Sequence, residues 1–112
     1  QMKVNDGVNA LHSSSLNFAS VKFDYSFEDS KEGVSLIFAY RQKAIPGVYP
    51  ANLDVKITYF LPRKGKRFEI FVSAMPDADA PINITNHSYF NLGGAKSILG
   101  AKLKINASKV AT

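Results

Sequence analysis

The sequence contains no cysteine, and it has only two histidines among its 112 residues. The absence of cysteine excludes a disulfide scaffold, a thiolate nucleophile and any zinc or iron–sulfur site that is ligated by cysteine. A transition-metal site built around two histidines would need carboxylates for its remaining ligands. Candidate functional residues must therefore be sought among the other polar side chains.

Long apolar runs are lacking as well. No stretch approaches the roughly 18 apolar residues that a membrane-spanning helix requires. The first six residues contain no apolar run after Lys3, so they do not read as a secretory signal. We therefore expect a cytoplasmic protein without a membrane partner. Gln1 is an unusual first residue, which indicates that the chain is processed or belongs to something longer.

Helical spacing of apolar residues is hard to find, whereas alternation of apolar and polar residues recurs along the chain. Polar, Gly-containing or Pro-containing stretches separate the alternating segments. Strands are predicted over residues 21–27, 34–40, 53–59, 68–75, 82–85 and 102–105. This pattern predicts a single all-β domain over residues 1–112, an antiparallel β-sandwich or part of one.

The chain is moderately basic, with a net charge of +5, and its densest basic run is RKGKR at residues 63–67. A nucleic-acid surface would combine such a run with stacking aromatic residues. The run occupies a predicted turn, where a solvated tip is the simpler interpretation. A basic β module bound to nucleic acid stays open as an alternative, although we expect no nucleic-acid partner.

One segment is unusually polar for a core strand. Residues 83–94 read NITNHSYFNLGG, which places the imidazole of His87 among amide, hydroxyl and phenol groups. Such groups can hold a hydroxylated ligand, and the glycines that follow allow a sharp turn beside a site. The alternative is a histidine that serves only the core or a turn.

This segment resembles the signature of the aldose 1-epimerase (galactose mutarotase) family, which typically reads NLTNHSYFNL. Residues 5–12, NDGVNALH, are similar to the family's N-x-G-x-N-x-L-H stretch, although Ser13 and Ser14 stand where the family usually has two glycines. Residues 48–53, VYPANL, are similar to the family's GYPGNL. The three segments follow the family's order, so the resemblance covers essentially the whole chain.

The resemblance implies a mutarotase-like β-sandwich, of which this chain would be an incomplete middle part. It implies interconversion of the α and β anomers of free hexoses such as galactose or glucose, without a metal or other cofactor. His87 would be the general acid, and His12, Ser88 and Tyr89 would also bind the sugar. The family's catalytic glutamate would lie beyond Thr112, which leaves open whether the chain itself is an enzyme.

The alternative function is a catalytically incomplete carbohydrate-binding or degenerate module that lacks the base. A sandwich cut out of a larger sheet also leaves strand edges and apolar surface uncovered. We therefore expect the chain to form a homodimer or to pair with a complementing chain.

Overall fold

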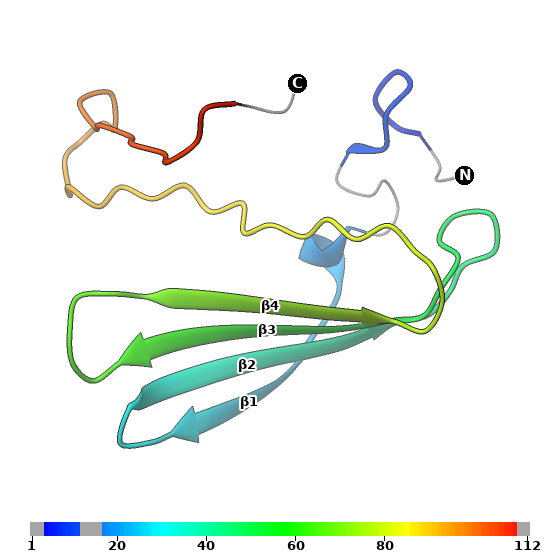
Figure 1. Cartoon of the computed structure of the whole chain (residues 1–112), viewed down its shortest axis with the longest axis horizontal. Helices are drawn as coiled ribbons and strands as arrows, with labels where there is room; N and C mark the ends of the chain where they lie inside the picture. Colours follow the sequence, from blue (N-terminus) through cyan, green and yellow to red (C-terminus); the bar gives the residue numbers. More distant parts are fainter. Residues whose placement is uncertain (1–3, 12–16, 110–112) are drawn as a thin grey trace.

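The structure is a computed structural model, and it describes residues 4–11 and 17–109. Its centre is one antiparallel sheet in which each strand pairs with the next along the chain (Figure 1). A three-residue 3-10 helix, η2 (Phe18–Ser20), precedes the sheet. The strands are β1 (Asp24–Asp29), β2 (Gly33–Gln42), β3 (Leu53–Pro62) and β4 (Glu69–Pro76). The all-β, antiparallel class predicted from the sequence is confirmed.

Local chemistry sets the two tight turns of the sheet. In the β1–β2 turn, the Ser30 hydroxyl accepts hydrogen bonds from the backbone N–H groups of Glu32 and Gly33, each at 3.2 Å. A Cβ at Gly33 would lie 2.5 Å from the carbonyl oxygen of Leu61, so glycine is required where β2 begins beside β3. In the β3–β4 turn, Gly65 has a φ of +95°. This backbone conformation favours glycine, because glycine has no Cβ that would clash with the neighbouring backbone.

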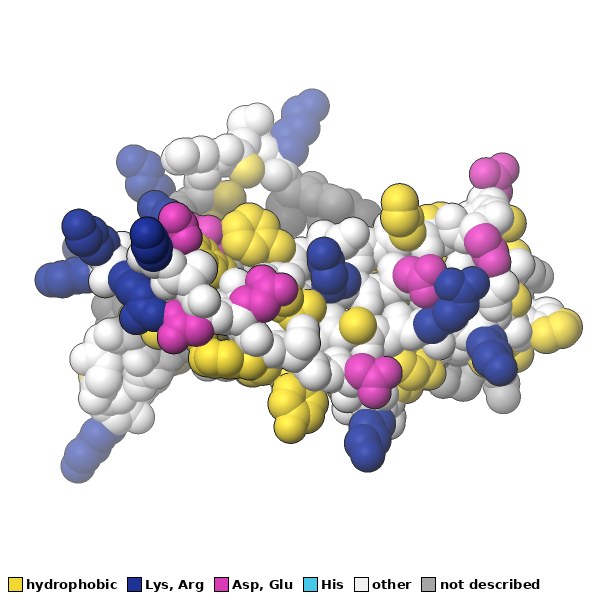
Figure 2. Space-filling model, turned by 90° about the horizontal axis from the view of Figure 1, so that it is seen from below, with side chains coloured by type: hydrophobic (Ala, Val, Ile, Leu, Met, Phe, Trp, Pro, Cys, Tyr) yellow, Lys and Arg dark blue, Asp and Glu magenta, His cyan; other side chains and the backbone are white. Residues whose placement is uncertain are grey.

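The register gives the sheet one apolar face and one mixed face, because side chains alternate between the two sides of each strand. The apolar side chains that share one face are Tyr25, Phe27, Val34, Leu36, Phe38, Tyr40, Leu53, Val55, Ile57, Tyr59, Leu61, Ile70, Val72, Ala74 and Pro76, and the polar residues Asp29 and Gln42 lie on this face at the ends of their strands. The opposite side, the mixed face, carries acidic and basic side chains interspersed with apolar ones. Figure 2 shows this mixture on the underside of the molecule.

The core is small and occupies one end of the apolar face. Its buried side chains are Tyr49 and Ala51 of the β2–β3 loop, together with Leu53 and Val55 at the start of β3. Partly buried residues pack against this cluster: Phe18, Phe23, Val48, Ile57, Ala74, Ala80 and Ile84. Much of the apolar face lies outside this cluster and is exposed. Phe27 on edge strand β1, for example, is 64% exposed.

Beyond β4 the chain continues without regular secondary structure. It passes above the sheet, turns, and returns above it (Figure 1). The strands predicted at 82–85 and 102–105 are therefore wrong, because the structure forms no strand in either segment. Alternation favours extended backbone, but a strand also needs a neighbouring edge with which its N–H and C=O groups can pair. Residues 83–87 lie across the apolar face instead of along an edge of the sheet.

The chain is more open than a compact domain of its length. Its radius of gyration is 17.4 Å, whereas a compact domain of this length would have about 13 Å. The described residues, 4–11 and 17–109, form one sheet. They do not form the second sheet that a complete sandwich would need. In the same ranges, no helix has the length and apolar character that crossing a membrane would require.

Candidate functional site

A cavity of about 470 Å³ lies between the apolar face and the chain segment that passes over it. We call residues 77–87 the crossing segment. The cavity is lined by Ile57, Tyr59, Ile70 and Val72 of the sheet, by Phe18, Phe23 and their neighbours near η2, and by residues 83–87. The polar motif singled out in the sequence therefore faces an apolar, aromatic surface. Such a combination suits a ligand that has both ring C–H groups and hydroxyl groups.

Asn86 links the segment around His87 to the sheet and to the next turn of the chain. The Nδ2 of Asn86 donates to the Tyr59 hydroxyl at 3.3 Å, and the Oδ1 of Asn86 accepts from the backbone N–H of Ser88 at 3.0 Å. The His87 ring lies beside the Tyr89 ring, with their centroids 5.6 Å apart. Residues 87–89 are all exposed. The imidazole is therefore accessible to a ligand, while the preceding residue, Asn86, is hydrogen-bonded to the sheet.

The structure describes three of the four site residues predicted from the sequence. His87, Ser88 and Tyr89 are consecutive, and His87 is the one of the three that lines the cavity. His12 lies outside the described residues. The roles of all four residues in sugar binding and proton transfer stay predictions.

The cavity lining offers amide, hydroxyl, phenol and imidazole groups. None of the described residues that line it is a carboxylate. In the described part of the chain, no group of three or more His, Asp or Glu side chains could hold a metal ion. The described lining thus provides hydrogen-bonding groups and a candidate proton donor, His87, but no carboxylate that could act as a base.

Two anchors hold the crossing segment against the sheet, and sequence reasoning assigned no role to either. The first is Tyr49, a buried residue whose hydroxyl donates to the carbonyl oxygen of Pro81 at 3.0 Å. Burial raises the pKa of Tyr49 above its usual value of 10.0, which keeps the phenol protonated as a hydrogen-bond donor. This contact joins the β2–β3 loop to the middle of the crossing segment.

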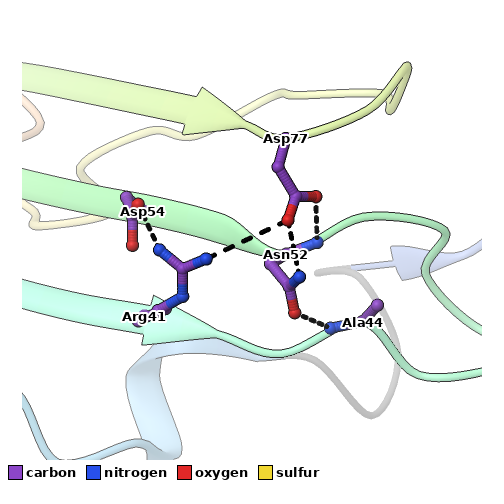
Figure 3. A network of polar contacts seen from close by, with 5 residues as sticks. All are labelled: Arg41, Ala44, Asn52, Asp54 and Asp77. Atoms are coloured by element: carbon purple, nitrogen blue, oxygen red, sulfur yellow. Dashed lines mark hydrogen bonds and ion pairs between the residues drawn. The ribbon is translucent and has the colours of Figure 1, made fainter.

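The second anchor is the pair Asn52 and Asp77 (Figure 3). The Asp77 carboxylate accepts from the backbone N–H of Asn52 at 2.8 Å and from its Nδ2 at 2.6 Å, while the Asp77 N–H donates to the Asn52 carbonyl at 3.1 Å. The Oδ1 of Asn52 accepts from the N–H of Ala44 at 2.9 Å. Arg41 lies 2.6 Å from Asp54 and 3.9 Å from Asp77. The Asn52 hydrogen bonds, with help from the Arg41 charge, lower the pKa of Asp77.

The sequence marks only one residue of each anchor pair. Tyr49 and Asn52 both lie in the VYPANL segment, whose resemblance to a family motif marked it without assigning its residues a role. Nothing in the sequence marked Asp77 or Pro81, because their contacts span 25 and 32 residues along the chain.

The basic turn at residues 63–67 pairs two of its four cations with the sheet's own acids. Arg63 pairs with Asp29 and donates from Nε to the Ser30 carbonyl at 2.9 Å. Arg67 pairs with Glu69. The first ion pair links the end of β3 to the end of β1, and the second lies at the start of β4, so both arginines contribute to the structure around the turn.

Comparison with known proteins identifies the family. The family model for aldose 1-epimerase matches residues 1–112, so the chain belongs to the aldose 1-epimerase family, as predicted from its motifs. It is 31% identical over 104 residues to the aldose 1-epimerase of Escherichia coli, covering 92% of this chain and 29% of that relative. It is 30% identical over 108 residues to the galactose mutarotase of Sus scrofa, covering 87% of this chain and 27% of that relative.

A third relative has a different name. The chain is 30% identical over 91 residues to the maltose epimerase of Levilactobacillus brevis, covering 81% of this chain and 26% of that relative. The chain thus spans less than a third of the length of these relatives. No solved structure matches the chain.

Proposed function

We propose that this chain carries part of the active site of an aldose 1-epimerase that interconverts the α and β anomers of a free hexose such as galactose or glucose. The observation that carries the proposal is the position of His87, in the segment that resembles the family signature and beside a cavity walled by aromatic and amide side chains. A pyranose has apolar C–H faces and a rim of hydroxyls, which matches such a cavity.

The chemistry requires two proton transfers. A base removes the proton from the anomeric hydroxyl, the C1–O bond to the ring oxygen breaks as the C1 carbonyl forms, and an acid protonates the ring oxygen. Rotation about C1–C2 and the reverse steps close the ring on the other face. An imidazole suits the acid role, since the ordinary pKa of histidine is about 6.5 and both protonation states are populated near neutral pH.

Within this proposal, His87 is the general acid. His12, Ser88 and Tyr89 bind the hydroxyl groups of the sugar, and no metal or other cofactor takes part. As the resemblance to the family implies, the base in this proposal is a carboxylate from outside these 112 residues, and none of the described residues that line the cavity is an acid. The cytoplasmic location expected from the sequence stays a prediction.

Polarimetry of freshly dissolved α-galactose tests this function. The full-length protein that contains this chain should accelerate the approach to the equilibrium rotation. The variant His87→Gln should lose about 10²–10⁴-fold in kcat, the range of a positioned acid or base. Leu99→Ala is the control, because Leu99 is 94% exposed and does not line the cavity. The absence of any acceleration by the full-length protein would refute the proposal.

A second possible function is hexose binding without catalysis, and it rests on the lack of a carboxylate among the described residues that line the cavity. By itself, the 112-residue chain would bind hexoses without converting them, because an acid without its base forfeits most of the rate. Calorimetric titration of the chain with galactose and glucose separates the cases. Binding without turnover favours this function, and the absence of both binding and turnover contradicts it.

A further inference from the structure

We propose that Asn52 and Asp77 are positioning residues, which fix the course of the crossing segment and thereby the place of His87 over the apolar face. The inference rests on the proposed function only where it concerns turnover. The positioning itself is a structural statement about the described residues.

The crossing segment depends on side-chain contacts for its position. No backbone-to-backbone hydrogen bond joins residues 78–90 to another described residue. Hydrogen bonds made by side chains attach the segment at Asp77, at Pro81 and at Asn86, and the side chains of Ala80 and Ile84 pack against the core cluster. Ten extended residues can span about 35 Å. The location of His87 therefore depends on where these contacts hold the chain and on the direction in which it leaves them.

The Asn52–Asp77 pair acts at the start of the segment and has the most hydrogen bonds. Asn52 directly precedes β3 and Asp77 directly follows β4, next to the register pair Leu53↔Pro76. The three hydrogen bonds between the two residues join the entrance of β3 to the exit of β4. A fourth, from Ala44 to Asn52, ties this joint to the β2–β3 loop. The direction in which the chain leaves the sheet is thereby set before the segment passes over the apolar face.

The same network contains a matched control. Asp54 pairs with Arg41 at 2.6 Å and has a side-chain exposure of 57%, close to the 49% of Asp77. Asp54 lies within β3 and is not among the residues that hold the crossing segment. Removing its carboxylate makes the same change in net charge and removes the shorter of the two Arg41 contacts, but it leaves the Asn52–Asp77 hydrogen bonds in place.

Spin-label distance measurement tests the positioning directly. Because the chain has no cysteine, the pair Ser26→Cys and Ser88→Cys introduces the only two labelling sites, one on β1 and one beside His87. When it is diluted into an excess of unlabelled chain, so that distances between copies do not contribute, the labelled chain should give one narrow distance distribution. Asn52→Ala and Asp77→Ala should broaden or shift it, whereas Asp54→Ala should leave it unchanged. Amide exchange of β2 and β3 checks that the sheet persists, and Asp77→Asn provides a milder variant if Asp77→Ala loses the sheet.

Two outcomes would overturn the proposal: an unchanged distribution in both anchor variants with an intact sheet, or equal broadening in Asp54→Ala. In the full-length protein, Asn52→Ala and Asp77→Ala should lower kcat for galactose about 10²-fold, since misplacement by about 1 Å can have an effect of that size. Asp54→Ala should retain the parental kcat. If the parent shows no turnover, the proposed function fails, while the distance measurements still decide the positioning.

Discussion

The exposed part of the apolar face predicts that the isolated 112-residue chain self-associates. The chain exposes 9699 Å², whereas a folded monomer of its mass exposes about 6,100 Å². Phe27 belongs to this face on edge strand β1 and is 64% exposed. Burying a whole phenylalanine side chain contributes about 1.5–3 kcal/mol, so the exposed portion leaves about 1–2 kcal/mol to be gained in each copy.

Phe27→Ser should therefore weaken association measurably. In a twofold dimer the substitution acts twice, which amounts to about 2–4 kcal/mol, or about a 30- to 1,000-fold increase in the dissociation constant. Sedimentation equilibrium over a range of concentrations measures this constant. Leu99→Ser is the matched control, because Leu99 is 94% exposed but lies outside the sheet. A parent chain that is monomeric at micromolar concentration and melts cooperatively would refute the reasoning.

Three further predictions concern the core and the anchors. Leu53→Ala should lower the free energy of unfolding by about 2–5 kcal/mol in urea titrations, because Leu53 is 3% exposed within the small core; a loss below 1 kcal/mol would contradict this placement. Tyr49→Phe should cost about 0.5–1.5 kcal/mol in the same assay, since it removes the hydrogen bond to the Pro81 carbonyl. The fold lowers the pKa of Asp77, so its contribution to stability is full above the usual value of 3.8 and is lost as the pH falls through the lower folded value. Asp77→Asn should flatten that part of the stability profile between neutral and acid pH, and a profile identical to the parent's would count against the anchor.

Alternation predicted the strands that find partners in the sheet and failed for those that do not. The segment 34–40 lies within β2, and 53–59 lies within β3, while the predicted segment 21–27 begins three residues before β1 and ends two residues before the end of β1. Residues 82–85 alternate as well, but they lie across the apolar face and have no edge to pair with. Local sequence therefore encodes the extended conformation, whereas pairing depends on what the rest of the chain places alongside.

The sequence likewise predicts only part of the candidate site. His87 was found because an imidazole surrounded by amide and hydroxyl residues is conspicuous in the sequence itself. The groups that hold its segment, such as Asp77 and the Pro81 carbonyl, were not found. Their roles come from contacts with Asn52 and Tyr49, which the fold alone brings near.

The meander order of the sheet has a consequence for the order of assembly. Each strand pairs with its neighbour in sequence, so the hairpins can close outward from the Ser30 and Gly65 turns with short loops and little loss of chain entropy. Topologies dominated by such local pairings fold faster than those that need distant partners. During synthesis the sheet can form once Pro76 has emerged, and residues 77–87 then meet a surface that is already built.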